Sequence, residues 1–180
     1  MKDALAIHRW LLAHQIHHEI LRLPRSLSGA EDLPEALGVP PEACVSVAVF
    51  QSVYAFGAER ATEPVAVVGT VSHPVEPMMV ASVLGAVEVR PAPAFEVNAV
   101  TDYAAGLVSP LLLPEELTVL VDQRFSEAFR PGDTVYTPTG ERATALRLRV
   151  RDLLAMTAGK SAELRRGPVS ASASRGRDRA

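Results

Sequence analysis

The order of apolar and polar positions along the chain predicts short helices interleaved with short strands. Residues 43–50 form a nearly continuous apolar run, which is typical of a strand covered on both faces. Residues 143–150 alternate arginine with apolar side chains, so one face of that strand packs on a core and the other meets solvent or a ligand. The same reasoning assigns further strands to residues 18–23, 64–71, 87–90, 117–122 and 134–136.

Helical spacing and glycine or proline punctuation predict the helices. Asp3 can cap a first helix whose apolar residues recur every three or four positions. Gly38 and Gly85 are placed to end two further helices, and Pro77 suits the first turn of the second. The predicted helices cover residues 3–15, 30–37, 77–84, 93–100, 123–129 and 151–158. Residues 51–64 form a polar interruption that we interpret as a hairpin or a loop.

The predicted order of elements favours an α+β fold. Strands outnumber what a doubly wound sheet would use, and hairpin-length turns join several of them. We therefore expect a mixed, mostly antiparallel sheet that curls toward a barrel and is flanked by short helices. Residues 1–160 are predicted to form one domain. Residues 161–180 carry five arginines against two acids and no apolar periodicity, which predicts a disordered basic tail. Such a tail is either only a solvated end or a segment that weakly attracts RNA phosphates.

Composition excludes several classes of protein. No apolar run is long enough to span a bilayer, and the first ten residues contain an acid where a signal peptide would be continuously apolar. A single cysteine, Cys44, rules out an intramolecular disulfide framework and is interpreted as a small buried apolar residue. No phosphate-binding loop, dinucleotide fingerprint or cysteine-based zinc motif occurs. We expect a cytoplasmic protein without a cofactor, a membrane partner or a DNA partner.

The histidines raise the question of a metal site. His14 and His18 would lie one helical turn apart on a continuous helix, as zinc ligands often do. The pattern changes from helix to strand between them, however, and no cysteine or aspartate supplies a third ligand. We therefore predict no metal site. His73 lies in a turn, where it is either a solvated loop histidine or a general base.

The chain is organised around residues 101–125. This segment passes Gly106 and Pro110 and ends in a β-type run closed by Asp122. Glycine permits positive φ and proline fixes φ, so together they determine the backbone of a loop. A rigid loop that leads into a buried strand can present backbone amides to a ligand. The alternative is an ordinary long connection.

Six positions in this segment carry a family signature: Thr101, Tyr103, Gly106, Val108, Pro110 and Asp122. In this pattern the chain resembles the YbaK/prolyl-tRNA-synthetase-associated editing family, whose members hydrolyse mischarged aminoacyl-tRNA. The likeness extends across most of residues 1–160. Asp102 and Leu107 stand where the family usually has glycines.

The resemblance implies a function and a site. The substrate would be the 3′ end of a mischarged aminoacyl-tRNA, and the reaction would be ester hydrolysis. Backbone amides near Gly106 and Ser109 would hold the carbonyl oxygen while water attacks. Because the family relies partly on a tRNA ribose hydroxyl, neither a metal nor a serine nucleophile is implied. The substrate-binding residues implied are Thr101, Asp102, Tyr103, Leu107, Val108, Pro110, Asp122, Gly140 and Arg142.

Ser46 is the main departure from the family. It takes the position of a lysine that positions the ester, and a short hydroxyl neither reaches nor neutralises an ester oxygen as a lysine does. Ser46 is also readily explained as a hydrogen-bonded core serine, and Asp122 as a cap of the helix that follows it. Two hypotheses follow: an aminoacyl-tRNA deacylase of reduced activity, or a non-catalytic tRNA- or aminoacyl-binding module with the same fold.

Overall fold

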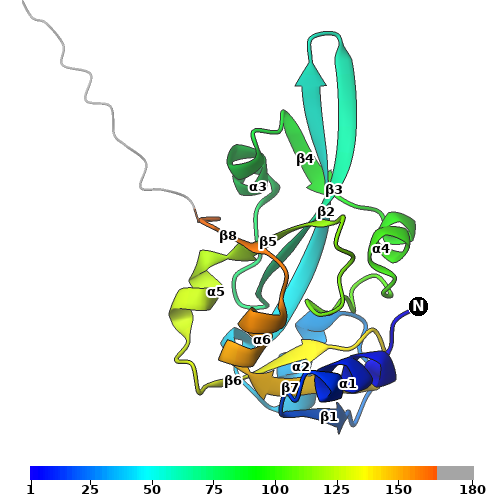
Figure 1. Ribbon diagram of the computed structural model, residues 1–180, viewed down its shortest axis with the longest axis vertical. Coiled ribbons are helices and arrows are strands. Elements are labelled where there is room, and N and C mark those ends of the chain that lie inside the picture. The colour runs from blue at the N-terminus through cyan, green and yellow to red at the C-terminus, as the bar shows by residue number, and fades with distance from the viewer. Residues whose placement is uncertain (166–180) are drawn as a thin grey trace, which may run out of the picture.

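A computed structural model describes residues 1–165 and shows an α+β architecture (Figure 1). The helices are α1 (Ala4–Ala13), α2 (Leu33–Leu37), α3 (Pro77–Leu84), α4 (Ala94–Thr101), α5 (Gln123–Ala128) and α6 (Val150–Met156), with 3-10 turns η1 (Ala30–Asp32) and η2 (Pro41–Ala43). The strands are β1 (His18–Arg22), β2 (Val45–Phe56), β3 (Glu59–Thr70), β4 (Glu88–Pro91), β5 (Thr118–Asp122), β6 (Thr134–Pro138), β7 (Thr144–Arg149) and β8 (Lys160–Ala162). No helix in residues 1–165 has the length and apolarity needed to cross a bilayer.

The larger sheet is built on a long hairpin. Its strand order is β4-β2-β3-β5-β8, with β2 antiparallel to β3 and β4, and with β5 parallel to β3 and β8. The hairpin turns at Gly57, whose φ of 65° suits glycine, and its tip projects beyond the body of the molecule (Figure 1). The polar residues 51–64 are therefore mostly extended strand, with only a tight turn between the two strands.

The smaller sheet has the order β1-β7-β6, and both of its pairings are antiparallel. In β7, Leu146 and Leu148 are buried while Arg147 and Arg149 are exposed, as the alternating pattern predicts. An isolated bridge between Cys44 and Tyr136 links this sheet to the larger one.

The main core lies between the inner faces of the two sheets. α1 contributes Ile7 and Leu11 to it, and β7 contributes Leu146 and Leu148. A smaller core gathers around Cys44, which has no exposed surface and whose thiol has its pKa raised to about 12 by burial. Cys44 is thus the small buried residue that the sequence predicts.

The prediction of an α+β fold with a mixed, mostly antiparallel sheet is confirmed. The strands divide between two sheets, and within residues 1–165 neither closes into a barrel. The predicted helices form within a few residues of their expected bounds, and both Gly38 and Gly85 end helices at positive φ.

The larger sheet extends beyond residue 160. β8 pairs with β5 through Lys160, Ser161 and Ala162, and both Ala162 and Leu164 are buried. Residues 161–165, which the composition assigns to a tail, therefore belong to the fold. Their pattern is too short to register as a periodic strand. Residues 166–180 of the predicted tail lie outside the described part of the chain.

We expect a chain that ends at Lys160 to be clearly less stable than one that ends at Arg165. The shorter chain loses strand pairing and the burial of Leu164, and that burial alone contributes about 2 kcal/mol. Urea unfolding of both chains and of residues 1–180 measures the difference. Equal stability of the two truncated chains would show that β8 adds nothing to the fold.

Candidate functional site

Tyr103 fixes the loop that follows α4. Its side chain has no exposed surface, and its hydroxyl donates a hydrogen bond to the carbonyl oxygen of Leu111 at 2.8 Å. Burial raises the pKa of this phenol well above its usual value, so the hydroxyl remains a donor. The bond spans eight residues, and it ties the two ends of the glycine- and proline-containing loop together.

Thr101 of the signature and Gly140 hold Tyr103 in place. Thr101 donates its hydroxyl hydrogen to the carbonyl oxygen of Val97 and accepts from the Tyr103 amide. Gly140 has φ of 91°, and a Cβ there would lie 2.5 Å from the Lys2 carbonyl oxygen and 2.8 Å from Cδ1 of Tyr103. Thr101, Tyr103 and Gly140 thus act on the loop's backbone.

Gly106 packs the loop against residues 27–30, the segment before α2. Its φ is 82°, and a Cβ there would lie 3.2 Å from the carbonyl oxygen of Ser28. The Ala30 amide donates to the Gly106 carbonyl oxygen at 2.9 Å. On the other side of this segment, Arg142 donates from Nη1 to the Leu27 carbonyl oxygen at 3.3 Å. The segment is therefore held at Ala30 by Gly106 and at Leu27 by Arg142.

A pocket of about 210 Å³ opens beyond Ala30, on the face of the larger sheet that is turned away from the main core. We call it the Ser46 pocket. Ser46 on β2 pairs with Gly69 on β3 at its floor, and the turn after β3 forms one wall. The lining residues are Ala30, Glu31, Ser46, Ala48, Val67, Gly69, Thr70, Val71, His73, Pro74 and Val75.

A hydroxyl–imidazole cluster occupies the wall of this pocket. Nδ1 of His73 lies 2.8 Å from Oγ of Ser72 and 3.4 Å from Oγ1 of Thr70, and the two hydroxyl oxygens are 3.0 Å apart. The His73 amide also donates to the Thr70 carbonyl oxygen at 3.2 Å, which closes the turn. His73 therefore has one ring nitrogen held by hydroxyls, and it lines the same pocket as Ser46.

Asp122 on β5 lies beside Gly69 of β3, on the same face of the larger sheet as Ser46. Its carboxylate is almost fully buried, accepts from the Arg124 amide as the cap of α5, and pairs with the Arg124 guanidinium at 2.6 Å. A Cβ on Gly69 would lie 3.7 Å from Cβ of Asp122, an ordinary van der Waals distance. The interpretation of Asp122 as a helix cap is confirmed.

The remaining loop residues point away from the Ser46 pocket. Leu107 is 2% exposed and packs in the smaller core, and Val108 is buried in the main core. Ser109 and Pro110 are buried as well. The Oγ of Ser109 accepts from the Leu111 amide at 3.4 Å. Leu107 therefore adds no bulk to the Ser46 pocket, contrary to what its place in a glycine position suggests.

Asp102 also lies outside the lining of the pocket. It ends α4 at φ of 60°, where the family's glycine would be unstrained, and its carboxylate pairs with the amino group of Met1 at 3.0 Å. The side chain is 57% exposed, so this ion pair is strongly screened.

Sequence patterns do not identify three polar residues in or beside the pocket, which are Glu31, Thr70 and Ser72. Glu31 lines it from η1, and its carboxylate lies over Gly29, where any Cβ would clash with it. Thr70 and Ser72 join His73 only because the chain turns sharply after β3. A histidine beside hydroxyl residues is too common a pattern to be recognised without that turn. In residues 1–165, no three metal-ligating side chains gather as a metal site.

Comparison with known proteins identifies the family of this domain. The profile of the aminoacyl-tRNA editing domain matches residues 25–156. Among curated proteins, none matches the sequence. Three solved structures share its fold at identities that show the fold alone. A hypothetical protein named APE2540 is 23% identical with a TM-score of 0.71, covering 88% of this chain and 97% of its own.

The other two structures are similarly related. A candidate trans-editing enzyme for prolyl-tRNA synthetase is 22% identical with a TM-score of 0.70, covering 89% of this chain and 95% of its own. A structure described under epitope backbone grafting by computational design onto scaffold proteins is 20% identical with a TM-score of 0.68, covering 90% of this chain and 96% of its own.

We expect Gly140→Ala to destabilise the protein by at least about 2 kcal/mol, because positive φ and a clash with backbone act together. Gly132→Ala is the matched control, since a Cβ there meets no atom within 4 Å and its φ is not positive. Thermal unfolding of both variants measures the difference. A Gly140→Ala protein as stable as the control would contradict the role of Gly140 in holding Tyr103.

Proposed function

Because the chain belongs to the aminoacyl-tRNA editing domain family, we propose that it hydrolyses the ester of mischarged aminoacyl-tRNA in the Ser46 pocket. The substrate in this proposal is the 3′ end of the tRNA with its amino acid, and the products are free amino acid and uncharged tRNA. In this proposal the domain acts in trans on tRNA charged by another enzyme.

The observation that carries the proposal is the placement of His73 and Ser46 in one pocket beside the Gly106 loop. An ester hydrolase needs a base for water, donors for the carbonyl oxygen and a recess for the acyl group. The pocket combines an imidazole, hydroxyl groups and apolar walls.

In the proposed reaction, His73 is the general base. When Nδ1 donates its hydrogen to Oγ of Ser72, Nε2 keeps a lone pair that can accept a proton from water. The water oxygen attacks the ester carbon as that proton moves to Nε2. The tetrahedral intermediate then collapses, the bond to the ribose oxygen breaks, and the proton returns to that oxygen.

The loop would stabilise the negative charge that develops on the carbonyl oxygen. The Gly106 amide is the donor in this proposal, because Gly106 contacts Ala30 at the edge of the pocket and no oxygen within residues 1–165 accepts a hydrogen bond from its N–H. Ser109, which the sequence pattern also suggests, is fully buried away from the pocket and is not part of the proposal. Donors held in a rigid loop need no reorganisation during the reaction, which makes them effective at a developing oxyanion. Tyr103 holds this loop rigid.

Two lining residues, Ser46 and Glu31, set the expected rate and substrate. Ser46 replaces the family's lysine and supplies no cation, so we expect slow deacylation. Glu31 lines the pocket, and its carboxylate can attract the α-ammonium group of the aminoacyl ester.

We expect His73→Ala to lower the single-turnover rate of deacylation by about 10²-fold or more, the typical contribution of a general base. Ser72→Ala should have a smaller effect because it removes only the hydroxyl that orients the imidazole. His14→Ala is the control, since the exposed His14 side chain is absent from the pocket lining and its Nδ1 contacts only the carbonyl oxygen of Trp10. An unchanged rate in His73→Ala would exclude His73 as the base.

We expect Ser46→Lys to raise the deacylation rate by up to about 10²-fold, because it restores a cation at the ester. The pocket offers Glu31 as a partner for the new ammonium group, which limits the cost of burying it. The rates of the native protein and the variant are compared under conditions where both proteins are fully folded. A native protein that is fast and is slowed by Ser46→Lys would contradict the assigned role of this position. Binding of mischarged tRNA without hydrolysis in any variant would identify a binding module instead.

A further inference from the structure

Basic side chains line the outer face of the smaller sheet, away from the Ser46 pocket. Arg147 and Arg149 project from the central strand β7 on the side opposite its buried leucines. Cross-strand pairing places Glu19 of β1 next to Arg147 and Thr134 of β6 next to Arg149. By the same register, His17 precedes β1 level with Arg149 and on the same face.

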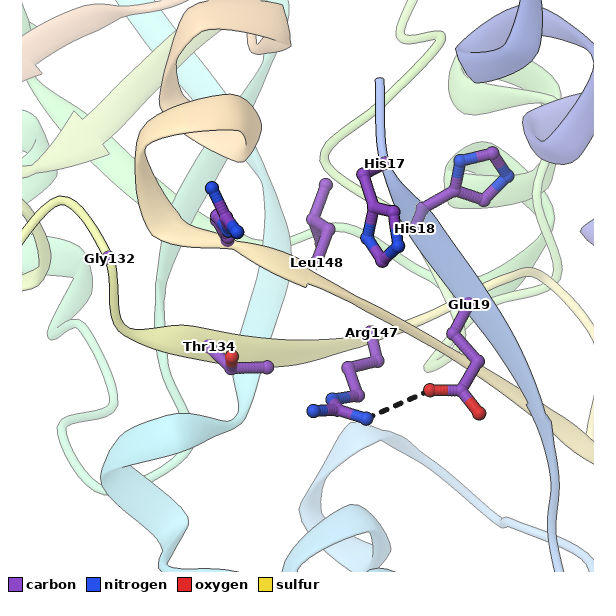
Figure 2. Close-up of a pocket in the computed structure, with 8 residues that line it drawn as sticks. His17, His18, Glu19, Gly132, Thr134, Arg147 and Leu148 are labelled. Carbon is purple, nitrogen blue, oxygen red and sulfur yellow. Dashed lines mark hydrogen bonds and ion pairs between the residues drawn. The ribbon is translucent and has the colours of Figure 1, made fainter. Parts of the chain in front are cut away.

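These residues surround a cavity of about 280 Å³, which we call the Arg149 cavity. Figure 2 shows His17, Thr134 and Arg147 around the hollow, with Arg147 joined to Glu19. The ring of His18 instead leaves the cavity, and both of its nitrogens are engaged, by Ile16 and by His8. The complete lining is His17, His18, Glu19, Gly132, Thr134, Arg147, Leu148 and Arg149.

The balance of charge in the cavity is positive. Arg147 pairs with Glu19 at 2.9 Å through Nη1 only, and both side chains are about half exposed. Arg149 makes no ion pair or side-chain hydrogen bond with any residue in 1–165. The nearby acid Asp133 is engaged by the Arg130 amide. One arginine is therefore free of protein partners, and a second is half-neutralised.

We propose that the Arg149 cavity binds a phosphate of an RNA backbone. This proposal rests on the proposed function and names the surface through which the same tRNA would be held. A guanidinium presents parallel N–H donors that match two phosphate oxygens, and the Thr134 hydroxyl and the His17 imidazole add donors nearby. Contacts to phosphate position an RNA without reading its sequence.

Strand pairing links the residues of the Arg149 cavity to those of the Ser46 pocket. Tyr136, the partner of Arg147 on β6, bridges to Cys44, and Ser46 follows two residues later. The cavity and the pocket therefore flank the junction of the two sheets. An RNA whose aminoacyl end enters the Ser46 pocket can place a backbone phosphate on β7 while it follows this junction.

Binding of uncharged tRNA, measured by fluorescence anisotropy over a range of salt concentrations, tests the proposal. We expect Arg149→Gln to weaken binding about three- to tenfold and to lower the slope of log affinity against log salt by about 1, the effect of one lost phosphate contact. Arg60→Gln is the matched control, because Arg60 is exposed on the distant hairpin and the charge change is equal. If both variants lost tRNA affinity equally, the loss would be explained by net charge alone, and the proposal would be overturned.

Glu19→Gln gives a test in the opposite direction that loss of folding cannot mimic. Removal of this carboxylate frees Arg147, so we expect tighter tRNA binding and a steeper salt dependence. Binding of inorganic phosphate, compared with binding of chloride at equal ionic strength, distinguishes a site for free phosphate from a site for the phosphates of RNA. Phosphate binding that needs Arg149, with tRNA affinity unchanged in every variant, would contradict the assignment to RNA.

A minimal substrate separates this proposal from the proposed function. Aminoacyl-adenosine lacks the RNA backbone, so Arg149→Gln should leave its hydrolysis unchanged while it raises KM for mischarged tRNA. If the native protein hydrolyses neither substrate but binds tRNA through Arg149, the proposed function fails and the phosphate site stands. Hydrolysis of both substrates with no effect of Arg149→Gln would overturn the phosphate site alone.

Discussion

The buried hydrogen bond from Tyr103 to the Leu111 carbonyl is the constraint on which the candidate site depends. It closes the loop after α4, and the tyrosine ring lies so close to Gly140 that position 140 has no room for a side chain. A closed loop holds Gly106 against Ala30, and Ala30 forms one edge of the Ser46 pocket. The signature residues of the family therefore act mainly on backbone geometry, because the pocket exists only where this loop is fixed.

The chemical groups of the pocket come from elsewhere in the fold. β2 and β3 supply the floor with Ser46 and Gly69, the turn after β3 supplies His73, and η1 supplies Glu31. The loop therefore supplies a rigid backbone, and other elements supply the side chains of the pocket. In the proposed reaction the side chains that meet the substrate come from these other elements, with Ser46 at the position where the resemblance implies a lysine.

The sequence predicts the fold better than the site, for physical reasons. Gly38 and Gly85 end helices because the positive φ required there suits glycine, and apolar periodicity reports burial directly. Side-chain direction in a loop has no period, so the burial of Leu107 away from the pocket could not be predicted. The contact of Ser72 with His73 depends on one turn, and β8 is too short to show a pattern.

The most direct test of the account is where an aminoacyl ester binds. Amide chemical shifts can be followed by NMR during titration with an aminoacyl-adenosine in which an amide replaces the ester, so that no hydrolysis occurs. We expect saturable shifts at Ala30, Ser46, Thr70 and His73, which line the Ser46 pocket, and at Gly106, which contacts Ala30. Shifts confined to the groove between α3 and β4, with none at Ser46 or His73, would contradict this expectation.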